Sequence, residues 1–251
     1  MKVLAIYNVK GGVGKTSTAV NLAYLAAAGG LRTLLWDLDP QAATSFYLRV
    51  EPKLGTRGRR LVVGGEDLAA SIRGTDFELL DLLPADLSCR KLDTALARAS
   101  KPRRRLAQGL SLLADEYDLV VLDPPPGLSL LAEAIFRAAD ALVVPTIPSH
   151  LSLRALQQLQ EFLRSKGPAD LPVLPFLSMV DRRRHLHRQD HRQPFTELGL
   201  RFLETEIPYA SQVEQMGVHR QPLPAFAATS AAAVAYHQLW AEVAASLGLA
   251  R

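Results

Sequence analysis

The residues most able to do chemistry in this chain are Lys10 to Ser17, which read Lys-Gly-Gly-Val-Gly-Lys-Thr-Ser. They follow the apolar run Val3–Tyr7 and precede the alanine-rich stretch Thr18–Ala28. Strand, glycine loop and helix form the context in which a P-loop binds phosphate, because the glycines let backbone N–H groups converge at the positive end of the helix. In this arrangement Lys15 bridges the terminal phosphates of a nucleoside triphosphate, and Thr16 holds Mg²⁺ through its hydroxyl. The loop residues expected to contact the nucleotide are Gly11, Gly12, Val13, Gly14, Lys15, Thr16 and Ser17.

The loop departs from the usual Walker A form in its first half. Val9 stands where the first glycine normally falls, and a second lysine, Lys10, follows at once. Lys10 is too far along the loop to duplicate the work of Lys15 within one subunit. The segment resembles the deviant Walker A motif of the ParA/MinD family, and of ParA/Soj-type partition ATPases in particular. The resemblance implies ATP and Mg²⁺ as cofactors and a homodimer that sandwiches ATP, in which Lys10 reaches the nucleotide of the partner subunit. Two lysines around one triphosphate make chemical sense, because enzymes catalyse phosphoryl transfer mainly by positioning the groups and neutralising their charge.

An acidic segment follows the second predicted strand, Thr33–Asp37. An aspartate just past a strand end can orient water or bind Mg²⁺ through water, although Asp39-Pro40 could also simply end the strand as a turn. By resemblance this segment is switch I. Asp39 is then expected to activate the attacking water and to contribute to the metal site, with Asp37 as a secondary candidate.

A second aspartate ends the uniformly apolar run Leu119–Leu122, a pattern typical of a strand buried on both faces. Asp123 is placed as in a Walker B motif, where it accepts from the Mg²⁺ shell and from Thr16. The following Pro124–Gly127 resembles switch II, which would sense the γ-phosphate by backbone contact.

The same resemblance suggests the adenine site. Met179 and Asp181 end a predicted strand where the family contacts the base, and Pro208 would form the other wall of that pocket.

The hydrophobic pattern alternates strands with helices, which predicts a doubly wound, mostly parallel α/β sheet with helices on both faces and the ligand at the carboxyl ends of the strands. A chain of 251 residues fits a single domain, 1–251. The expected strands are 3–8, 33–37, 77–83, 119–122, 141–145, 173–180 and 202–207. The expected helices are 16–28, 87–99, 103–116, 153–166, 184–198 and 229–247.

The composition is that of an ordinary globular protein, with 48% hydrophobic and 22% charged residues. No apolar segment reaches the length of a membrane span, and the single cysteine, Cys89, excludes an intramolecular disulfide and fits a reducing cytoplasm. Two cysteines in a dimer are also too few for a Cys₄ iron–sulfur cluster of the nitrogenase iron-protein kind.

Arginines supply most of the positive charge and gather in clusters. Arg184, Arg188 and Arg192 recur every four residues, so on a helix they form one cationic stripe, with Arg183 beside it. Such a stripe can neutralise several phosphates and bind DNA without sequence preference, although a solvated helix face has the same pattern. The resemblance to ParA favours DNA, whereas Tyr209 replaces a basic residue that many relatives carry.

The function expected from these features is a ParA-like ATPase that dimerises with ATP, binds nonspecific DNA on the nucleoid and positions a plasmid, chromosome or protein assembly. A ParB-like or cargo-adaptor partner would stimulate slow hydrolysis. A MinD-like regulator at a membrane or a cell pole is the main alternative. The tail around Leu239, Val243 and Leu247, however, indicates a helix packed on the domain, and no membrane partner is expected. A metabolic ATP-dependent ligase or amidase of the same superfamily is the third possibility.

Overall fold

The computed structural model describes residues 1–51, 68–181 and 199–249. Its centre is an eight-stranded sheet of order β3-β4-β2-β5-β1-β6-β7-β8, in which only the short edge strand β3 runs antiparallel to its neighbour. The strands are β1 Lys2–Ile6, β2 Thr33–Asp37, β3 Arg73–Gly74, β4 Leu80–Leu83, β5 Leu119–Asp123, β6 Ala141–Thr146, β7 Val173–Val180 and β8 Glu206–Pro208. The predicted doubly wound, mostly parallel α/β fold is confirmed.

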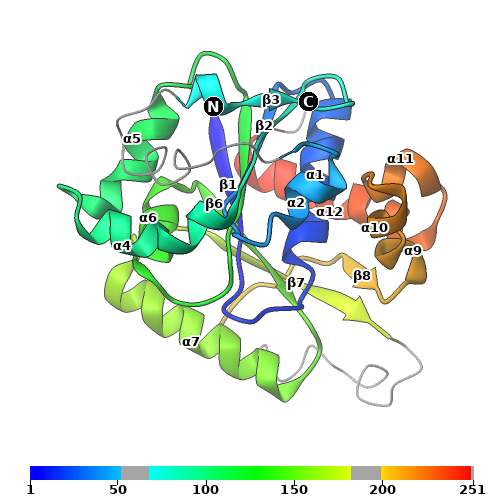
Figure 1. Cartoon of the computed structure of the whole chain (residues 1–251). Coiled ribbons are helices and arrows are strands. Elements are labelled where there is room, and N and C mark those ends of the chain that lie inside the picture. Colours follow the sequence, from blue (N-terminus) through cyan, green and yellow to red (C-terminus); the bar gives the residue numbers. More distant parts are fainter. Residues whose placement is uncertain (52–67, 182–198, 250–251) are drawn as a thin grey trace.

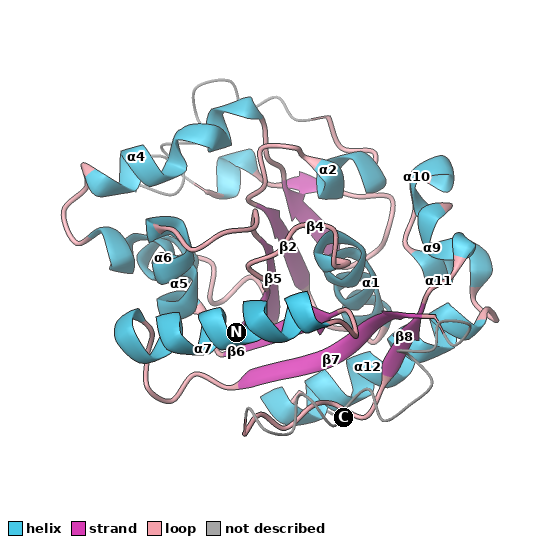
Figure 2. Cartoon of the chain, turned by 90° about the horizontal axis from the view of Figure 1, so that it is seen from below, coloured by secondary structure: helices cyan, strands magenta, loops and turns pink. Residues whose placement is uncertain are grey.

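Helices cover both faces of this sheet (Figures 1 and 2). The described helices are α1 Lys15–Ala28, α2 Ala43–Tyr47, α4 Leu92–Ala97, α5 Arg105–Ser111, α6 Leu130–Ala138, α7 His150–Lys166, α9 Ser211–Glu214, α10 Met216–His219, α11 Leu223–Ala227 and α12 Ala231–Leu247. Short 3₁₀ turns occur at η1 Ala69–Ser71, η2 Leu87–Lys91 and η3 Pro102–Arg104.

Alternate residues of the central strands build two separate cores. Val120 packs with residues of α4 to α7 on one face, whereas its neighbour Val121 packs with α1 and α12 on the other. Because side chains alternate along a strand, a strand buried on both faces must be apolar at every position. The run from Leu119 to Leu122 meets this requirement, because all four of its residues are apolar and fully buried.

The parallel order brings the candidate segments to one edge of the sheet. The P-loop follows β1, the Asp39 segment follows β2, Asp123 ends β5, and Asp181 follows β7. Since the strands run in the same direction, their carboxyl ends meet at that edge, which is where doubly wound folds bind ligands.

Several element boundaries differ from the predicted ones. The predicted strand 202–207 is shorter and later, Glu206–Pro208, because its pairing with β7 joins Glu206 to Leu177 and Pro208 to Val180. The predicted helix 103–116 ends at Ser111, and α6 occupies a segment for which the sequence pattern predicts no helix. The predicted helix 184–198 lies outside the described residues.

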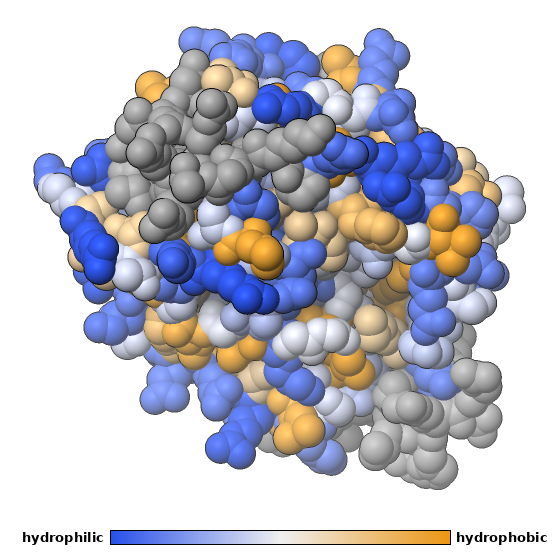
Figure 3. Space-filling view, viewed as in Figure 1, coloured by the Kyte–Doolittle hydropathy of each residue, from blue (hydrophilic) through white to orange (hydrophobic). Residues whose placement is uncertain are grey.

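The C-terminal helix packs on the domain as predicted. Leu239 and Val243 of α12 are fully buried, and Leu247 is nearly so. No helix in the described ranges is both long and apolar enough to span a bilayer. Figure 3 shows hydrophobic side chains scattered among hydrophilic ones on one face of the molecule, without a wide apolar patch among its described residues.

Candidate functional site

The glycine loop connects β1 to α1, which confirms the predicted strand–loop–helix context. Gly12 (φ 71°) and Gly14 (φ 93°) have left-handed backbone conformations, which L side chains rarely adopt. A Cβ at Gly14 would also come within 3.1 Å of Ser178 Oγ. Glycine at these positions therefore allows the loop to turn and to lie close to β7.

Two buried side chains that the sequence pattern does not single out anchor the loop. Asn8 Nδ2 donates to the Pro145 carbonyl (2.8 Å), and its Oδ1 accepts from the Lys10 amide (2.9 Å). Ser178 Oγ donates to the Val13 carbonyl (3.0 Å). The signal for both is a polar residue near the carboxyl end of an apolar stretch: Asn8 lies two residues after β1, and Ser178 is the one polar residue within β7.

Lys15 lies in the loop with only 8% of its surface exposed. Its Nζ donates to the Lys10 carbonyl at 3.1 Å. Burial lowers the pKa of the Lys15 ammonium, while the charges of Asp123 and Asp39 act in the opposite direction. Burial has removed water from around this ammonium, so it is well placed to bind phosphate oxygens, which would replace that water.

The other residues of the loop are more accessible. Lys10 is partly exposed, and its ammonium forms no ion pair with another described residue. Gly11 is exposed, and Thr16 and Ser17 are partly buried. Ser17 Oγ donates to the Gly14 carbonyl at 3.1 Å, within the first turn of α1.

Asp37 and Asp123 are direct neighbours across the β2–β5 pairing. Both are buried, and the pKa of the Asp37 carboxyl is raised, first by burial and then by the charge of Asp123. Asp37 Oδ2 accepts from the amide (3.0 Å) and hydroxyl (2.9 Å) of Ser45, and Oδ1 accepts from the Asp39 amide (3.1 Å). Asp37 thus uses both oxygens to hold the segment that carries Asp39.

Asp123 keeps one oxygen free. Its Oδ2 accepts from Thr44 Oγ1 at 2.6 Å, whereas the buried Oδ1 has no hydrogen-bond partner among the described residues. Burial raises the pKa of the Asp123 carboxyl, and the hydroxyls of Thr44 and Thr16 and the charge of Lys15 oppose that shift. An unsatisfied buried carboxylate oxygen is costly, so this position suits a group that donates to it.

Asp39 lies beside these groups in a tight turn. Its Oδ1 accepts from the Gln41 amide at 2.9 Å, and its carbonyl accepts from the Ala42 amide at 2.9 Å. Asp39 follows β2, Asp123 ends the neighbouring strand β5, and the P-loop follows β1 beside it, so all three lie at the same edge of the sheet. The charge of Asp39 raises the pKa values of both Lys15 and Asp123.

A magnesium ion fits this constellation. No group of three or more His, Cys, Asp or Glu side chains gathers into a metal site within the described ranges. Mg²⁺ in nucleotide sites, however, usually takes one or two protein ligands, substrate phosphates and several waters. Thr16 and the free Oδ1 of Asp123 would meet that requirement, and Asp39 follows β2 at the same edge of the sheet.

The predicted switch II segment is linked to the strand that precedes the P-loop. The buried Tyr7 hydroxyl donates to the Gly127 carbonyl at 2.5 Å. Gly127 has a left-handed φ of 106°, and a Cβ on Gly11 would lie 3.9 Å from Pro126. The P-loop and switch II therefore lie next to each other.

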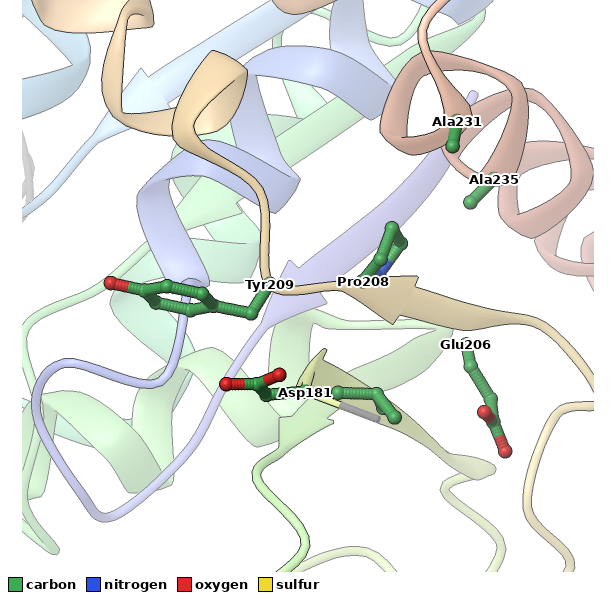
Figure 4. Close-up of a pocket in the computed structure, with 7 residues that line it drawn as sticks. Asp181, Glu206, Pro208, Tyr209, Ala231 and Ala235 are labelled. Carbon is green, nitrogen blue, oxygen red and sulfur yellow. The ribbon is translucent and has the colours of Figure 1, made fainter. Parts of the chain in front are cut away.

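Two of the three predicted adenine contacts line one pocket of about 520 Å³. Figure 4 shows Asp181 at the end of β7, Pro208 on β8, and Ala231 and Ala235 of α12 around it. Val180, Glu206 and Tyr209 complete the lining. Met179 is not part of it; its φ is 56°, and its Cε lies 3.7 Å from the position of a Gly14 Cβ. Met179 thus lies beside the P-loop.

The arginines expected to contact DNA (Arg183, Arg184, Arg188 and Arg192) lie outside the described residues.

Known proteins resemble this chain over nearly its whole length. A family model described as an AAA domain matches residues 1–166. The sporulation initiation inhibitor protein Soj of Bacillus subtilis is 31% identical over 250 residues, which cover 98% of this chain and 99% of Soj. The chromosome partitioning protein ParA of Caulobacter vibrioides is 31% identical over 254 residues, covering 97% of this chain and 94% of ParA.

A solved structure shares the same fold. Cobyrinic acid a,c-diamide synthase from Mycobacterium smegmatis, with bound ADP and magnesium, matches with a TM-score of 0.80 at 26% identity. The match covers 98% of this chain and 96% of the synthase. The full-length similarity to Soj and ParA, the P-loop between β1 and α1, and the aspartates at the ends of β2 and β5 agree: the chain belongs to the ParA/MinD family of P-loop ATPases.

Proposed function

We propose that this partition-type ATPase forms an ATP-sandwich homodimer, binds nonspecific DNA in the dimeric state and positions a cargo such as a plasmid, a chromosome or a protein assembly. A ParB-like or cargo-adaptor partner resets it by stimulating slow hydrolysis. Full-length similarity to Soj and to chromosome partitioning protein ParA supports this function and its assignment to a single domain, 1–251. The location that follows is the nucleoid, in the cytoplasm.

The observation that carries the proposal is the arrangement of Lys15 and Asp123. A buried lysine lies in the glycine loop, and a buried carboxylate with one free oxygen lies close enough to affect its pKa. As a P-loop ATPase of this family, the chain uses ATP and Mg²⁺. Lys15 and the loop amides would bind the phosphates, and Thr16 and Asp123 would hold Mg²⁺, which supplies charge neutralisation.

The remaining roles concern water and the second subunit. Asp39 would orient the attacking water, since the turn that bears it is fixed by Asp37. The partly exposed Lys10 would contact the phosphates bound by the partner subunit. The pocket lined by Asp181 and Pro208 would take the adenine, with Met179 between that pocket and the loop.

Two alternative functions are less well supported. A MinD-like membrane regulator needs a terminal amphipathic helix that is free to insert, whereas the apolar residues of α12 are buried against α1 and the sheet. A metabolic ligase is suggested by the similarity to cobyrinic acid a,c-diamide synthase, but at 26% identity, lower than the 31% shared with Soj.

DNA binding provides the direct test of the proposed function. A labelled duplex of arbitrary sequence should bind in the presence of ATP and not with ADP or without nucleotide. Reversing two charges, Arg184→Glu with Arg188→Glu, should weaken this binding and reduce the slope of log affinity against log salt by about 0.9 for each phosphate that is no longer neutralised. ATP-dependent dimerisation should be unaffected.

A matched pair of charge reversals identifies the surface. Arg98→Glu with Arg104→Glu makes the same change at two exposed positions near α4 and η3. Abolished DNA binding in this pair alone would assign the DNA surface to that region. If the wild-type protein binds no DNA in any nucleotide state, the proposed role in partition is wrong. Anionic vesicles would then test the membrane regulator, and amide-forming substrates would test the ligase.

A further inference from the structure

One hydrogen bond connects the predicted metal carboxylate to the helix that follows Asp39. Thr44 lies in α2, and its Oγ1 donates to Asp123 Oδ2 at 2.6 Å. Thr44 is fully buried, and Asp123 is 1% exposed. A short bond from a hydroxyl to an ionised carboxylate is among the stronger hydrogen bonds in proteins, and burial shields it from competing water.

The same aspartate is bonded to the other end of the Asp39 turn. The Leu38 amide donates to the Asp123 carbonyl at 3.0 Å. Between Leu38 and Thr44 the chain must reverse direction, and Ala42 does so with a left-handed φ of 52°. A non-glycine residue in this conformation is held there by its surroundings. Asp123 therefore contacts the segment bearing Asp39 on both sides of that turn.

The opposite side of α2 is also fixed. Arg220 Nε donates to the Phe46 carbonyl (3.0 Å), and its guanidinium lies 4.7 Å from the centre of the Phe46 ring. Arg49 Nη2 donates to the His219 carbonyl at 2.9 Å. These arginines join α2 to the end of α10, so α2 has little freedom to move away from Asp123 on its own.

We propose that Thr44 is a positioning residue for the magnesium site: its hydroxyl fixes the Asp123 carboxylate with Oδ1 available to the metal, and ties the turn bearing Asp39 to that carboxylate. The proposal rests on the role of Asp123 given under Proposed function. Oδ2 already accepts from Thr44, whereas the buried Oδ1 has no hydrogen-bond partner among the described residues and is therefore the oxygen available to the Mg²⁺ shell. Groups that hydrogen-bond a metal-binding carboxylate set its orientation and basicity.

The test is a Mg²⁺ titration of nucleotide binding, with a fluorescent ADP as the probe. Thr44→Val keeps the shape of the side chain and removes the donor, so the carboxylate can turn. The Mg²⁺ concentration that gives half of the increase in ADP affinity should rise about 10-fold or more. ADP affinity in EDTA should match that of the wild-type protein, and Thr44→Ser should recover most of the Mg²⁺ response.

A matched control separates positioning from stability. Thr33→Val removes another buried hydroxyl, which donates to the Leu31 carbonyl at 2.9 Å far from the carboxyl edge of β2. It should lower thermal stability without moving the Mg²⁺ midpoint. If Thr44→Val folds poorly, Thr44→Ser and Thr44→Ala make the comparison instead, because they differ only in the hydroxyl.

The outcomes distinguish this proposal from the proposed function. Asp123→Asn should abolish the Mg²⁺ response that the wild-type protein shows. If the ADP affinity of the wild-type protein does not change with Mg²⁺, the magnesium site proposed at Asp123 is wrong. A clear difference between wild type and Asp123→Asn, together with a Thr44→Val variant that titrates like wild type, would leave the site intact and overturn the role of Thr44.

Discussion

Replacing Lys15 by alanine is expected to abolish ATP binding at concentrations that saturate the wild-type protein. Lys15 is 8% exposed, and its ammonium donates to the Lys10 carbonyl, a neutral acceptor. Triphosphate oxygens bound in a buried loop without this cation would lack their nearest counter-charge. Removing one partner of a buried charge pair costs about 3 kcal/mol or more, which is roughly a 100-fold decrease in affinity. Isothermal titration calorimetry with ATP and Mg²⁺ measures this directly.

The control removes a lysine that does not face the site. Lys2 begins β1, and its Nζ lies 3.8 Å from Asp140 Oδ1 with both side chains well exposed. Lys2→Ala changes the net charge equally and should bind ATP like the wild-type protein. Tight ATP binding by Lys15→Ala would contradict the assignment of residues 10–17 as a P-loop.

Replacing Asp39 by alanine is expected to block hydrolysis while leaving ATP bound. Removing the Asp39 carboxylate costs the turn one hydrogen bond, from the Gln41 amide, while the bonds from the Asp39 and Leu38 amides to Asp37 and Asp123 still hold its backbone. Removal of a group that orients or deprotonates the attacking water lowers the rate by roughly 100-fold or more. The variant should accumulate as an ATP dimer on DNA and fail to turn over.

Phosphate release and DNA retention should be measured on the same sample. Asp170→Ala removes an exposed carboxylate beyond the end of α7 and provides the matched control, with wild-type turnover expected. Brisk hydrolysis by Asp39→Ala would exclude the proposed role of Asp39 and would require another water-orienting group at this edge of the sheet.

The main strands and the P-loop could be predicted because local sequence determines them. The run Leu119–Leu122 is apolar at every position since both of its faces are covered, and glycines occupy the left-handed positions of the loop. The sequence also places Asp37 and Asp123 at strand ends. Their direct adjacency depends on the pairing register of β2 with β5, which no local pattern encodes.

Other features depend on tertiary contacts. Helices α2, α9 and α10 have four or five residues, too few for helical periodicity to reveal them. The apolar pattern places strand β8 too early because Phe202 and Leu203 are apolar, but these residues pack against the two cores, and pairing with β7 begins at Glu206. Thr44 and Ser45 carry no distinctive signal because hydroxyl residues are common in turns, and only the fold shows which carboxylates they contact.

The unpredicted helix α6 has a local signal. Ser129 is its N-cap, and its Oγ accepts from the Ala132 amide at 3.4 Å. An apolar stripe follows in Leu131 and Ile135, both buried. The prolines and Gly127 that precede it are typical of loops, so the sequence pattern predicts that the loop continues through this segment.

The most direct test of the ATP-sandwich dimer measures the molar mass of the wild-type protein by multi-angle light scattering, with Mg²⁺ and a saturating non-hydrolysable ATP analogue. We expect twice the monomer mass of 27.4 kDa with the analogue and the monomer mass without nucleotide. Lys10→Ala should bind the analogue and remain monomeric. A wild-type protein that is saturated with the analogue and still elutes as a monomer would contradict the dimer on which the proposed function depends.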